Sequence, residues 1–273
     1  MSTRVVYTDL DGTMVGPRGS FWHTADRDLT DDPAAALHDL HRAGVALVLV
    51  SGRTFEQVVE AARIFAADGA IAELGATISW DAARQTHQLT GALPAEYAGR
   101  TPMAVMAELG VVDALVAEYP GQVEWHEPWH VTHRTDALLR GRLDPLSVDA
   151  WLAERGLGWL TLKDNGALPR TARTALAPAQ APARIYHLMP RGITKGAAIA
   201  WDLRRRGIDP ADAVAIGDSV SDLEMARAVD RLWITANGAT VDGMADLLAA
   251  VPNVTVTDAP MGEGWAQAVR ASL

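Results

Sequence analysis

Short apolar runs alternate with amphipathic stretches over the first 80 residues, and this pattern predicts alternating strands and helices. The predicted strands are 4–9, 45–50 and 70–73, the predicted helices are 32–43 and 55–66, and a hairpin pairs 77–80 with 86–89. Residues 45–50 are apolar throughout and leave no face for solvent, as expected of a parallel strand covered on both sides. Pro33 in the first turn and Gly44 just past the end fit the limits of the first helix.

The last third of the chain returns to the same alternation. A helix over 194–206 is followed by strands 213–217, 231–235 and 253–257, with helices near 220–229, over 240–250 and from 262 onward. Strands and helices in this order predict an α/β fold with a doubly wound parallel sheet, whose helices cover both faces.

The middle of the chain has a different pattern. Helical signals at 101–118 and 145–155 alternate with short strands near 122–126, 131–135, 158–162 and 184–188. We therefore expect an α+β module at 84–187, inserted into a core made of 1–83 and 188–273. Residues 165–183 are rich in Ala, Pro and Thr without clear periodicity, which predicts a long loop, either disordered or part of a lid.

Composition limits the classes of function. The chain has 273 residues, of which 49% are hydrophobic and 21% charged, enough for a full core and a second module. No apolar run approaches the roughly 18 residues of a membrane span. A cleaved signal peptide would remove the first predicted strand, so we expect a cytoplasmic protein. The absence of cysteine excludes disulfides, thiolate metal sites and a cysteine nucleophile.

The charge is strongly acidic. The chain has 24 basic and 34 acidic residues, for a net charge of −10, which disfavours nucleic acid and anionic lipid as partners. A phosphorylated small molecule would also be repelled at long range. Local cations and backbone N–H groups must therefore capture such a substrate.

Two carboxylates lie two residues apart at the end of the first predicted strand, in Asp9-Leu10-Asp11-Gly12-Thr13. In extended backbone, positions i and i+2 face the same way, so both acids can point into one site, and Gly12 lets the chain turn sharply after them. One acid can attack a phosphate while the other moves a proton, with a divalent cation between them.

Three further segments lie at or near the ends of predicted strands: Ser51-Gly52-Arg53, Lys195, and Gly217-Asp218-Ser219-Val220-Ser221-Asp222. Ser51 offers a hydroxyl at a helix N-terminus, which suits a phosphate oxygen, and Lys195 offers a point charge. Asp218 and Asp222 add hard oxygen ligands that, with Asp9, suit Mg²⁺. Each segment alone is more often a turn, an N-cap or a solvated lysine. Their order and placement favour one site, because ligands bind at the carboxyl ends of strands in open α/β sheets.

These four segments resemble the signature motifs of the haloacid dehalogenase (HAD) superfamily phosphatases, over the two core segments. Asp9 and Ser51 are 42 positions apart (51 − 9), whereas Ser51 and Lys195 are 144 apart (195 − 51), which leaves room for a cap between the second and third motifs. That spacing resembles the C2-cap, type IIB branch: the Cof-like, sucrose-phosphatase-like and mannosyl-3-phosphoglycerate-phosphatase-like enzymes.

The resemblance implies a role for each matching residue. Asp9 would be the nucleophile that forms an aspartyl-phosphate, and Asp11 would be the general acid and base, with its carbonyl on Mg²⁺. The other implied roles are phosphate binding by Thr13, Ser51, Gly52 and Lys195, direct metal ligation by Asp218, and support of the metal by Asp222. The chain departs from Cof-like proteins at Ser221 and Leu74, where they often carry asparagine.

The inserted module should select the substrate. Trp125-His126-Glu127-Pro128-Trp129-His130-Val131-Thr132-His133-Arg134 combines aromatic rings with hydrogen-bonding groups, which suits a sugar. The alternative is that the tryptophans are core and the histidines surface. A metal site at His126, His130 and His133 is disfavoured, because Pro128 breaks the helix that would align them.

The candidate substrate residues are Arg53, Trp125, His126, Arg134 and Lys163. Lys163-Asp164-Asn165 lies at a strand end, where an ordinary turn is the alternative, and a surface salt bridge is the alternative for Arg53.

The sequence thus predicts a Mg²⁺-dependent phosphomonoester hydrolase acting on a sugar phosphate or glycosyl phosphate ester, as a monomer or homodimer. Three alternatives remain. They are a phosphomannomutase-like phosphotransferase, a glycosyltransferase whose Asp9-Leu10-Asp11 holds a metal–nucleotide complex, and a binding protein that keeps the fold without turnover.

Overall fold

The computed structural model describes residues 3–168 and 172–273 and divides into two compact units. Unit 1 comprises Met1–Leu89 with Thr194–Leu273, and unit 2 comprises Thr90–Ile193. Both boundaries lie six residues beyond the predicted ones. The reason is that the hairpin strand β5 (Gln85–Gln88) pairs with the sheet of unit 1, while β9 (Arg184–Pro190) pairs within unit 2.

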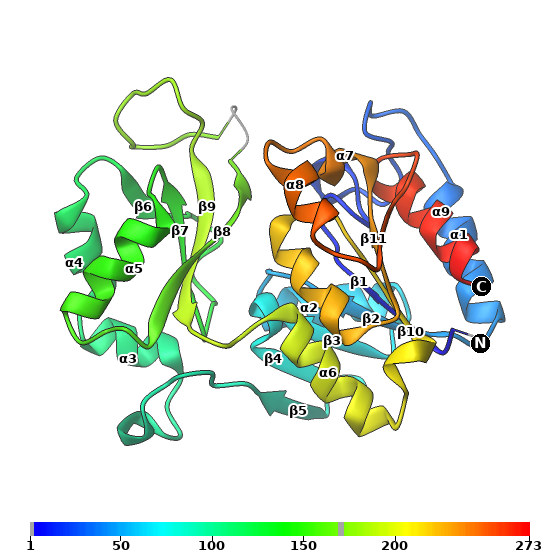
Figure 1. The fold of residues 1–273 in the computed structure, drawn as a ribbon, viewed down its shortest axis with the longest axis horizontal. Coiled ribbons are helices and arrows are strands. Elements are labelled where there is room, and N and C mark those ends of the chain that lie inside the picture. The colour runs from blue at the N-terminus through cyan, green and yellow to red at the C-terminus, as the bar shows by residue number, and fades with distance from the viewer. Residues whose placement is uncertain (1–2, 169–171) are drawn as a thin grey trace. The chain divides into compact units, whose positions relative to one another are not determined.

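Unit 1 is built on an eight-stranded sheet of order β12-β11-β10-β1-β2-β3-β4-β5 (Figure 1). The strands from β12 to β3 are parallel, and β4 and β5 are antiparallel. Besides β5, the strands are β1 (Val5–Thr8), β2 (Ala46–Val50), β3 (Gly69–Ala72), β4 (Thr77–Trp80), β10 (Ala213–Gly217), β11 (Arg231–Ile234) and β12 (Val254–Val256). This sheet confirms the predicted doubly wound α/β fold.

Helices cover both faces of the central strands (Figure 1). On one face lie α1 (Asp32–Arg42), α2 (Phe55–Ile64) and α9 (Met261–Ser272), and on the other lie α6 (Lys195–Arg206) and the 3₁₀ helix η5 (Val220–Ala228). Shorter elements complete the unit: η1 (Pro17–Gly19), η2 (Glu73–Gly75), η4 (Pro210–Asp212), α7 (Ala236–Ala239) and α8 (Met244–Ala249).

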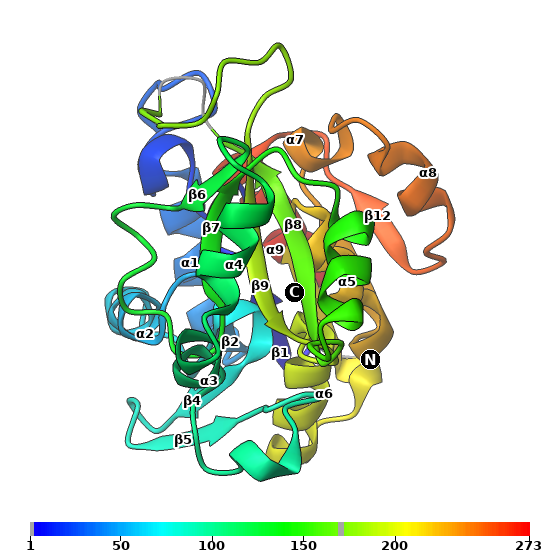
Figure 2. The same ribbon diagram turned by 90° about the vertical axis from the view of Figure 1, so that its left-hand side faces the viewer.

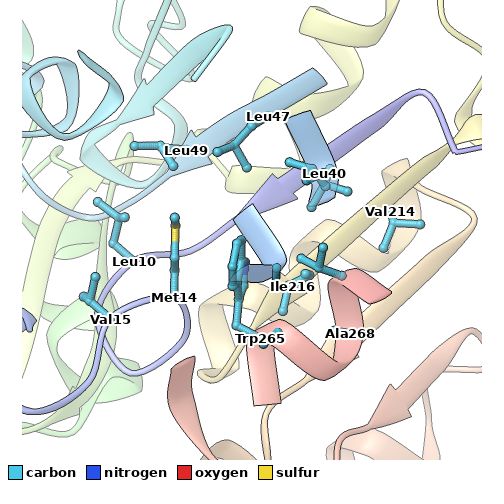
Figure 3. Packing of buried hydrophobic residues seen from close by; sticks show 14 of the residues in the cluster. Leu10, Met14, Val15, Leu40, Leu47, Leu49, Val214, Ile216, Trp265 and Ala268 are labelled. Carbon is cyan, nitrogen blue, oxygen red and sulfur yellow. The ribbon is translucent and has the colours of Figure 1, made fainter. Parts of the chain in front are cut away.

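The core of the first face anchors the loop that follows β1. In Figure 3, Trp265 from α9 lies among Met14, Leu40 and Ile216, and all four side chains are buried. Leu10 and Met14, on either side of the predicted catalytic turn, belong to the same cluster. Burial of these side chains fixes the turn between them at the carboxyl end of β1.

Unit 2 is an antiparallel sheet of order β6-β7-β9-β8 with helices on one face (Figure 2). Besides β9, the elements are β6 (Val123–Trp125), β7 (Ala137–Gly141), β8 (Leu160–Ala167), η3 (Ala95–Tyr97), α3 (Pro102–Glu108), α4 (Val111–Glu118) and α5 (Pro145–Glu154). The helices cover the sheet with a separate apolar cluster that includes Leu115, Trp151 and Tyr186. This is the predicted α+β module.

Some predicted elements are placed differently in the structure. The prediction of a strand at 131–135 is wrong. The strand that pairs with β6 and β9 is β7, which begins six residues later. The helix expected at 101–118 is two helices, separated at Gly110, whose φ of +63° is not helical. Strand β8 continues into the start of the loop expected at 165–183, and residues 169–171 of that loop lie outside the described part.

None of the helices in the described residues has the length and apolar content needed to cross a bilayer.

Candidate active site

The turn after β1 brings the two predicted catalytic acids to the carboxyl end of the sheet. The N–H of Asp9 still donates to the carbonyl of Ile216 on β10 at 2.9 Å, so Asp9 is held by the strand. Gly12 has a φ of +83°, and a Cβ there would lie 2.3 Å from Oδ2 of Asp218. Glycine is therefore required both for the backbone conformation and for the close approach of that carboxylate. Asp9 is buried, whereas the Asp11 side chain is 54% exposed.

Lys195 joins two buried carboxylates. It is the first residue of α6, which Thr194 caps by accepting from the N–H of Ala197 at 2.9 Å. The Nζ of Lys195 donates to Oδ1 of Asp9 at 2.8 Å and to Oδ1 of Asp222 at 2.6 Å. Lys195 is 2% exposed, so both ion pairs are shielded from water.

Gly196 explains how α6 comes near enough for Lys195 to reach Asp222. A Cβ at Gly196 would lie 2.1 Å from the carbonyl oxygen of Glu224 in η5. Only glycine permits this approach of the two helices, and a side chain would move Lys195 away from Asp222.

Asp222 organises the loop that follows β10. Its Oδ2 accepts from the N–H of Asp218 at 3.0 Å, and from the N–H and Oγ of Ser219 at 2.8 and 2.7 Å. Together with the Lys195 bond, these contacts use both carboxylate oxygens. Asp222 is thus arranged to position the loop after β10.

Asp218 is held by two side chains from other strand ends. Thr13 Oγ1 donates to its Oδ1 at 2.9 Å, and Asn237 Nδ2 donates to its Oδ2 at 3.2 Å. The same Nδ2 contacts the carbonyl of Gly12 at 2.9 Å, so Asn237 ties the nucleophile turn to this carboxylate. The amide of Asn237 is itself oriented by the N–H of Met261, which donates to Oδ1 at 2.8 Å.

Asn237 was missed from the sequence. It lies three residues beyond the carboxyl end of β11, a parallel strand of the same sheet, where the rule that located the other segments also applies.

The carboxylates raise one another's pKa values. Burial, followed by the charges of Asp222 and Asp11, raises the pKa of Asp9 to about 7, although Lys195 opposes the rise. Burial and the charges of Asp9 and Asp222 raise the pKa of Asp218 well above its usual range. Burial disfavours the ammonium of Lys195, but Asp222 and Asp9 outweigh it and raise the Lys195 pKa.

This charge distribution fits a divalent cation. Ligand atoms of Asp9, Asp218 and Asp222 lie within 4.8 Å of one another. Three carboxylates and one ammonium leave a formal charge of −2 (−3 + 1) in a largely buried space. Carboxylate oxygens are the ligands that Mg²⁺ prefers, so the residues fit the predicted metal.

Ser51, Gly52 and Arg53 follow β2, next to the turn after β1. Ser51 is 2% exposed, and its Oγ accepts from the N–H of Arg53 at 3.2 Å. The guanidinium of Arg53 makes two hydrogen bonds to Asp11, both at 2.6 Å, and the bond to Asp11 raises the pKa of Arg53. Arg53 thus holds Asp11, the predicted general acid and base, whose side chain is exposed.

The other four candidate substrate residues lie in unit 2. Trp125 ends β6 and packs against the core of that unit, which favours its structural interpretation. His126 continues β6, since its N–H donates to Leu138 O at 3.0 Å. Lys163 lies on β8 in register with His187, and Arg134 lies on the loop before β7.

Known proteins are similar to this chain in sequence and in fold. Residues 166–250 match the haloacid dehalogenase-like hydrolase family. The chain is 23% identical to a phosphoglycolate phosphatase of Pyrobaculum aerophilum over 100% of this chain and 97% of that protein. The sucrose-phosphatase of Synechocystis, solved with sucrose and phosphate, is similar with a TM-score of 0.64 and 14% identity, covering 100% and 98% of the two chains. A HAD subclass IIB sugar phosphatase is similar with a TM-score of 0.62 and 16% identity, covering 98% of each.

The family match supports the resemblance to haloacid dehalogenase-like hydrolases that the motifs indicated, and the similar structures confirm the fold.

Proposed function

We propose that this chain is a Mg²⁺-dependent phosphoric monoester hydrolase that acts through an aspartyl-phosphate on Asp9. The observation that carries the proposal is the contact of Lys195 with both Asp9 and Asp222 beside Asp218, at the carboxyl ends of β1 and β10. A buried carboxylate next to a fixed cation and a set of metal-binding oxygens is the arrangement that phosphoryl transfer requires.

Each residue then has a defined task. An oxygen of Asp9 attacks the phosphorus, the bond from phosphorus to the ester oxygen breaks, and the leaving alcohol takes a proton from Asp11. Water attacks the aspartyl-phosphate, gives its proton to Asp11 and restores Asp9 as inorganic phosphate leaves. Lys195 and Ser51 hold the phosphoryl oxygens throughout, and Arg53 keeps Asp11 oriented between the two steps.

Mg²⁺ would be held by Asp9, Asp218 and the carbonyl of Asp11, where it would neutralise the phosphate and offset repulsion among the carboxylates. Asp222 supports this set by fixing the backbone of Asp218 and the ammonium of Lys195.

The substrate proposed is a sugar phosphate or a glycosyl phosphate ester, in the cytoplasm. Support comes from the similar sugar and sucrose phosphatases and from the exposed ring of Trp129 in the segment 125–134. The curated relative is named for phosphoglycolate, so phosphoglycolate belongs in the same screen as hexose, disaccharide and polyol phosphates and nucleotides.

Replacing the nucleophile tests the reaction. Asp9→Asn should lower turnover of p-nitrophenyl phosphate at least about 10³-fold, since the amide is not a nucleophile. The control is Asp39→Asn, on the exposed side of α1, which should keep full activity with the same circular dichroism spectrum. Undiminished turnover by Asp9→Asn would refute the assignment.

Two measurements separate the alternatives. Release of inorganic phosphate without a bisphosphate activator argues against a phosphotransferase. Phosphate release that is abolished by chelation and restored by Mg²⁺ argues against a non-catalytic binding protein.

A further inference from the structure

A second cluster of metal-binding side chains lies in unit 2, around the buried carboxylate of Asp136. His133 Nδ1 lies 2.8 Å from Oδ1 of Asp136, and His187 Nδ1 lies 2.6 Å from Oδ2. The side chains of His133 and His187 are each 2% exposed, and that of Asp136 is 0% exposed. Ligand atoms of the three residues lie within 4.8 Å of one another. One carboxylate therefore faces two imidazoles in a space closed to water.

The strand register explains why these residues meet. Asp136 directly precedes β7, and Leu138 on β7 is paired with His187 on β9. Leu139 and Tyr186, their neighbours along the strands, point into the apolar core, so Leu138 and His187 face the other side of the sheet. His133 completes the cluster from the turn before β7, where its N–H donates to His130 O.

Two more imidazoles lie on the same loop. The Nδ1 atoms of His126 and His130 are buried and have no hydrogen-bond partner in the described part of the chain. His126 pairs with Leu138 on β7, which is itself in register with His187. Burial, followed by the charges of Arg140, His187, His133 and His130, lowers the pKa of His126 to about 4. Four of the chain's eight histidines are thus gathered around one end of this sheet.

We propose that Asp136, His133 and His187 bind a divalent first-row transition metal, of the class of Zn²⁺ or Co²⁺, in unit 2. Neutral imidazoles with their protons on Nε2 would present both Nδ1 lone pairs to the ion, one on each side of the carboxylate. Bonds of about 2.0–2.2 Å at tetrahedral angles put donor atoms about 3.3–3.6 Å apart, so each nitrogen and its facing oxygen would move apart by about 0.5–1 Å. His126 and His130 offer further nitrogen donors on the neighbouring loop.

The surrounding charge selects the kind of metal. Lys163 is in register with His187, and Arg140, which is paired with Glu124 at 2.6 Å, follows Leu138 by two residues on β7, so cationic side chains border the cluster. An ion held by charge alone, such as Mg²⁺, is disfavoured there. The same cations disfavour a transition metal much less, because its bonds to imidazole nitrogen are largely covalent. Imidazole suits Zn²⁺, Ni²⁺ and Cu²⁺.

Such an ion would link the 126–136 loop to β9. Because an ion that binds only the folded state stabilises that state, we expect it to raise the thermal midpoint of the full-length protein.

The test uses full-length protein carrying Asp218→Asn, which weakens the carboxylate cluster of unit 1. After dialysis against chelator, Co²⁺ titration should show about one ion per chain with the visible absorption of an imidazole-bound ion. His133→Gln and His187→Gln should each weaken binding at least about tenfold. The control is His87→Gln on β5, whose ring stacks on Trp201 at 4.1 Å in unit 1 and which should bind Co²⁺ as before.

A second measurement needs no substitution in the cluster. Zn²⁺ should shift the Nδ1 resonances of His133 and His187 in nitrogen NMR and leave those of His87 unchanged. No bound Co²⁺ in the Asp218→Asn protein, equal binding by His187→Gln, or unshifted His133 and His187 resonances would each overturn the proposal. The three residues would then be a hydrogen-bonded structural bridge without an ion.

Discussion

Lys195→Met removes the cation that Asp9 and Asp222 share, with little change in side-chain volume. Both carboxylates are buried and bonded to Nζ at 2.8 and 2.6 Å, so the variant leaves them facing each other without compensation. Loss of one partner from a buried ion pair costs about 3–5 kcal/mol. The rise of the Asp9 pKa from 3.8 to about 7 with lysine present sets a scale of about 4 kcal/mol for burying this carboxylate, at about 1.36 kcal/mol per pKa unit.

The destabilisation should depend on pH, and the sign follows from proton linkage. Lys195 has a raised pKa and stays charged throughout pH 5–8 in the native protein. In the variant, Asp9 has a pKa raised further, so its folded state holds a proton that its unfolded state loses above about pH 4. Below about pH 7 Asp9 is protonated in both folded proteins, so both lose stability with rising pH at the same rate, and above pH 7 only the variant continues to lose it. The difference in stability should therefore reach about 3–5 kcal/mol at pH 8 and be about 1 kcal/mol smaller at pH 5.

Urea unfolding in the presence of chelator, at pH 5, 6.5 and 8, measures this difference. The matched control is Lys163→Met, because Lys163 is the only other lysine in the chain. It lies on β8 and is partly exposed, and its loss should change stability by less than about 1 kcal/mol at every pH. A loss for Lys195→Met that is equal at pH 5 and pH 8 would refute the electrostatic reasoning and point to packing alone.

Three further predictions concern the metal and the acid. Asn237→Ala should raise the Mg²⁺ concentration for half-maximal activity about tenfold or more, whereas Asn253→Ala, which also removes a bonded amide, should leave it unchanged. Because protons compete with Mg²⁺ for Asp9, the Mg²⁺ concentration for half-maximal activity of the parent protein should fall several-fold per pH unit up to about pH 7 and then level off. A Mg²⁺ requirement that does not change with pH would contradict the raised pKa of Asp9. Arg53→Lys should lower kcat/KM about tenfold in steady-state assays, since one ammonium cannot make both bonds to Asp11, and unchanged kcat/KM would remove Arg53 from the site.

The strand ends of unit 1 were predictable because their signals are local. Apolar runs mark β1, β2 and β10, and the polar residues that follow them, including Asp9, Ser51 and Asp218, meet at one edge by the geometry of parallel sheets. The roles of these residues stay predictions, but their proximity is now a property of the structure. Asn237 was not predicted, because a single asparagine forms no recognisable motif. Its position just after β11 nevertheless indicates that it lies at the same edge of the sheet.

Unit 2 was harder to predict, because the pairing between its strands, more than the local sequence, determines which segments become strands. Residues 131–135 contain β-branched Val131, Thr132 and Thr135, which favour a strand, yet they lie on a loop. β7 instead uses alanine and leucine and is a strand because β6 and β9 pair on either side of it. A metal site at His126, His130 and His133 was disfavoured on their spacing along the chain. The strand register instead brings His187, which lies 54 positions beyond His133 (187 − 133), to Asp136.

The position of β1 between β2 and β10 has a consequence for synthesis on the ribosome. Asp9 and Lys195 are 186 positions apart, and Val5 pairs with Ala213. At about 5–20 residues per second, β1 waits roughly 6–25 s after the first hairpin is made before β10 emerges. During that interval one apolar edge of β1 has no neighbour and is open to misassociation, while Thr90–Ile193 is complete and free to fold. Limited proteolysis of stalled nascent chains would show β1 becoming protected only once β10 has left the exit tunnel.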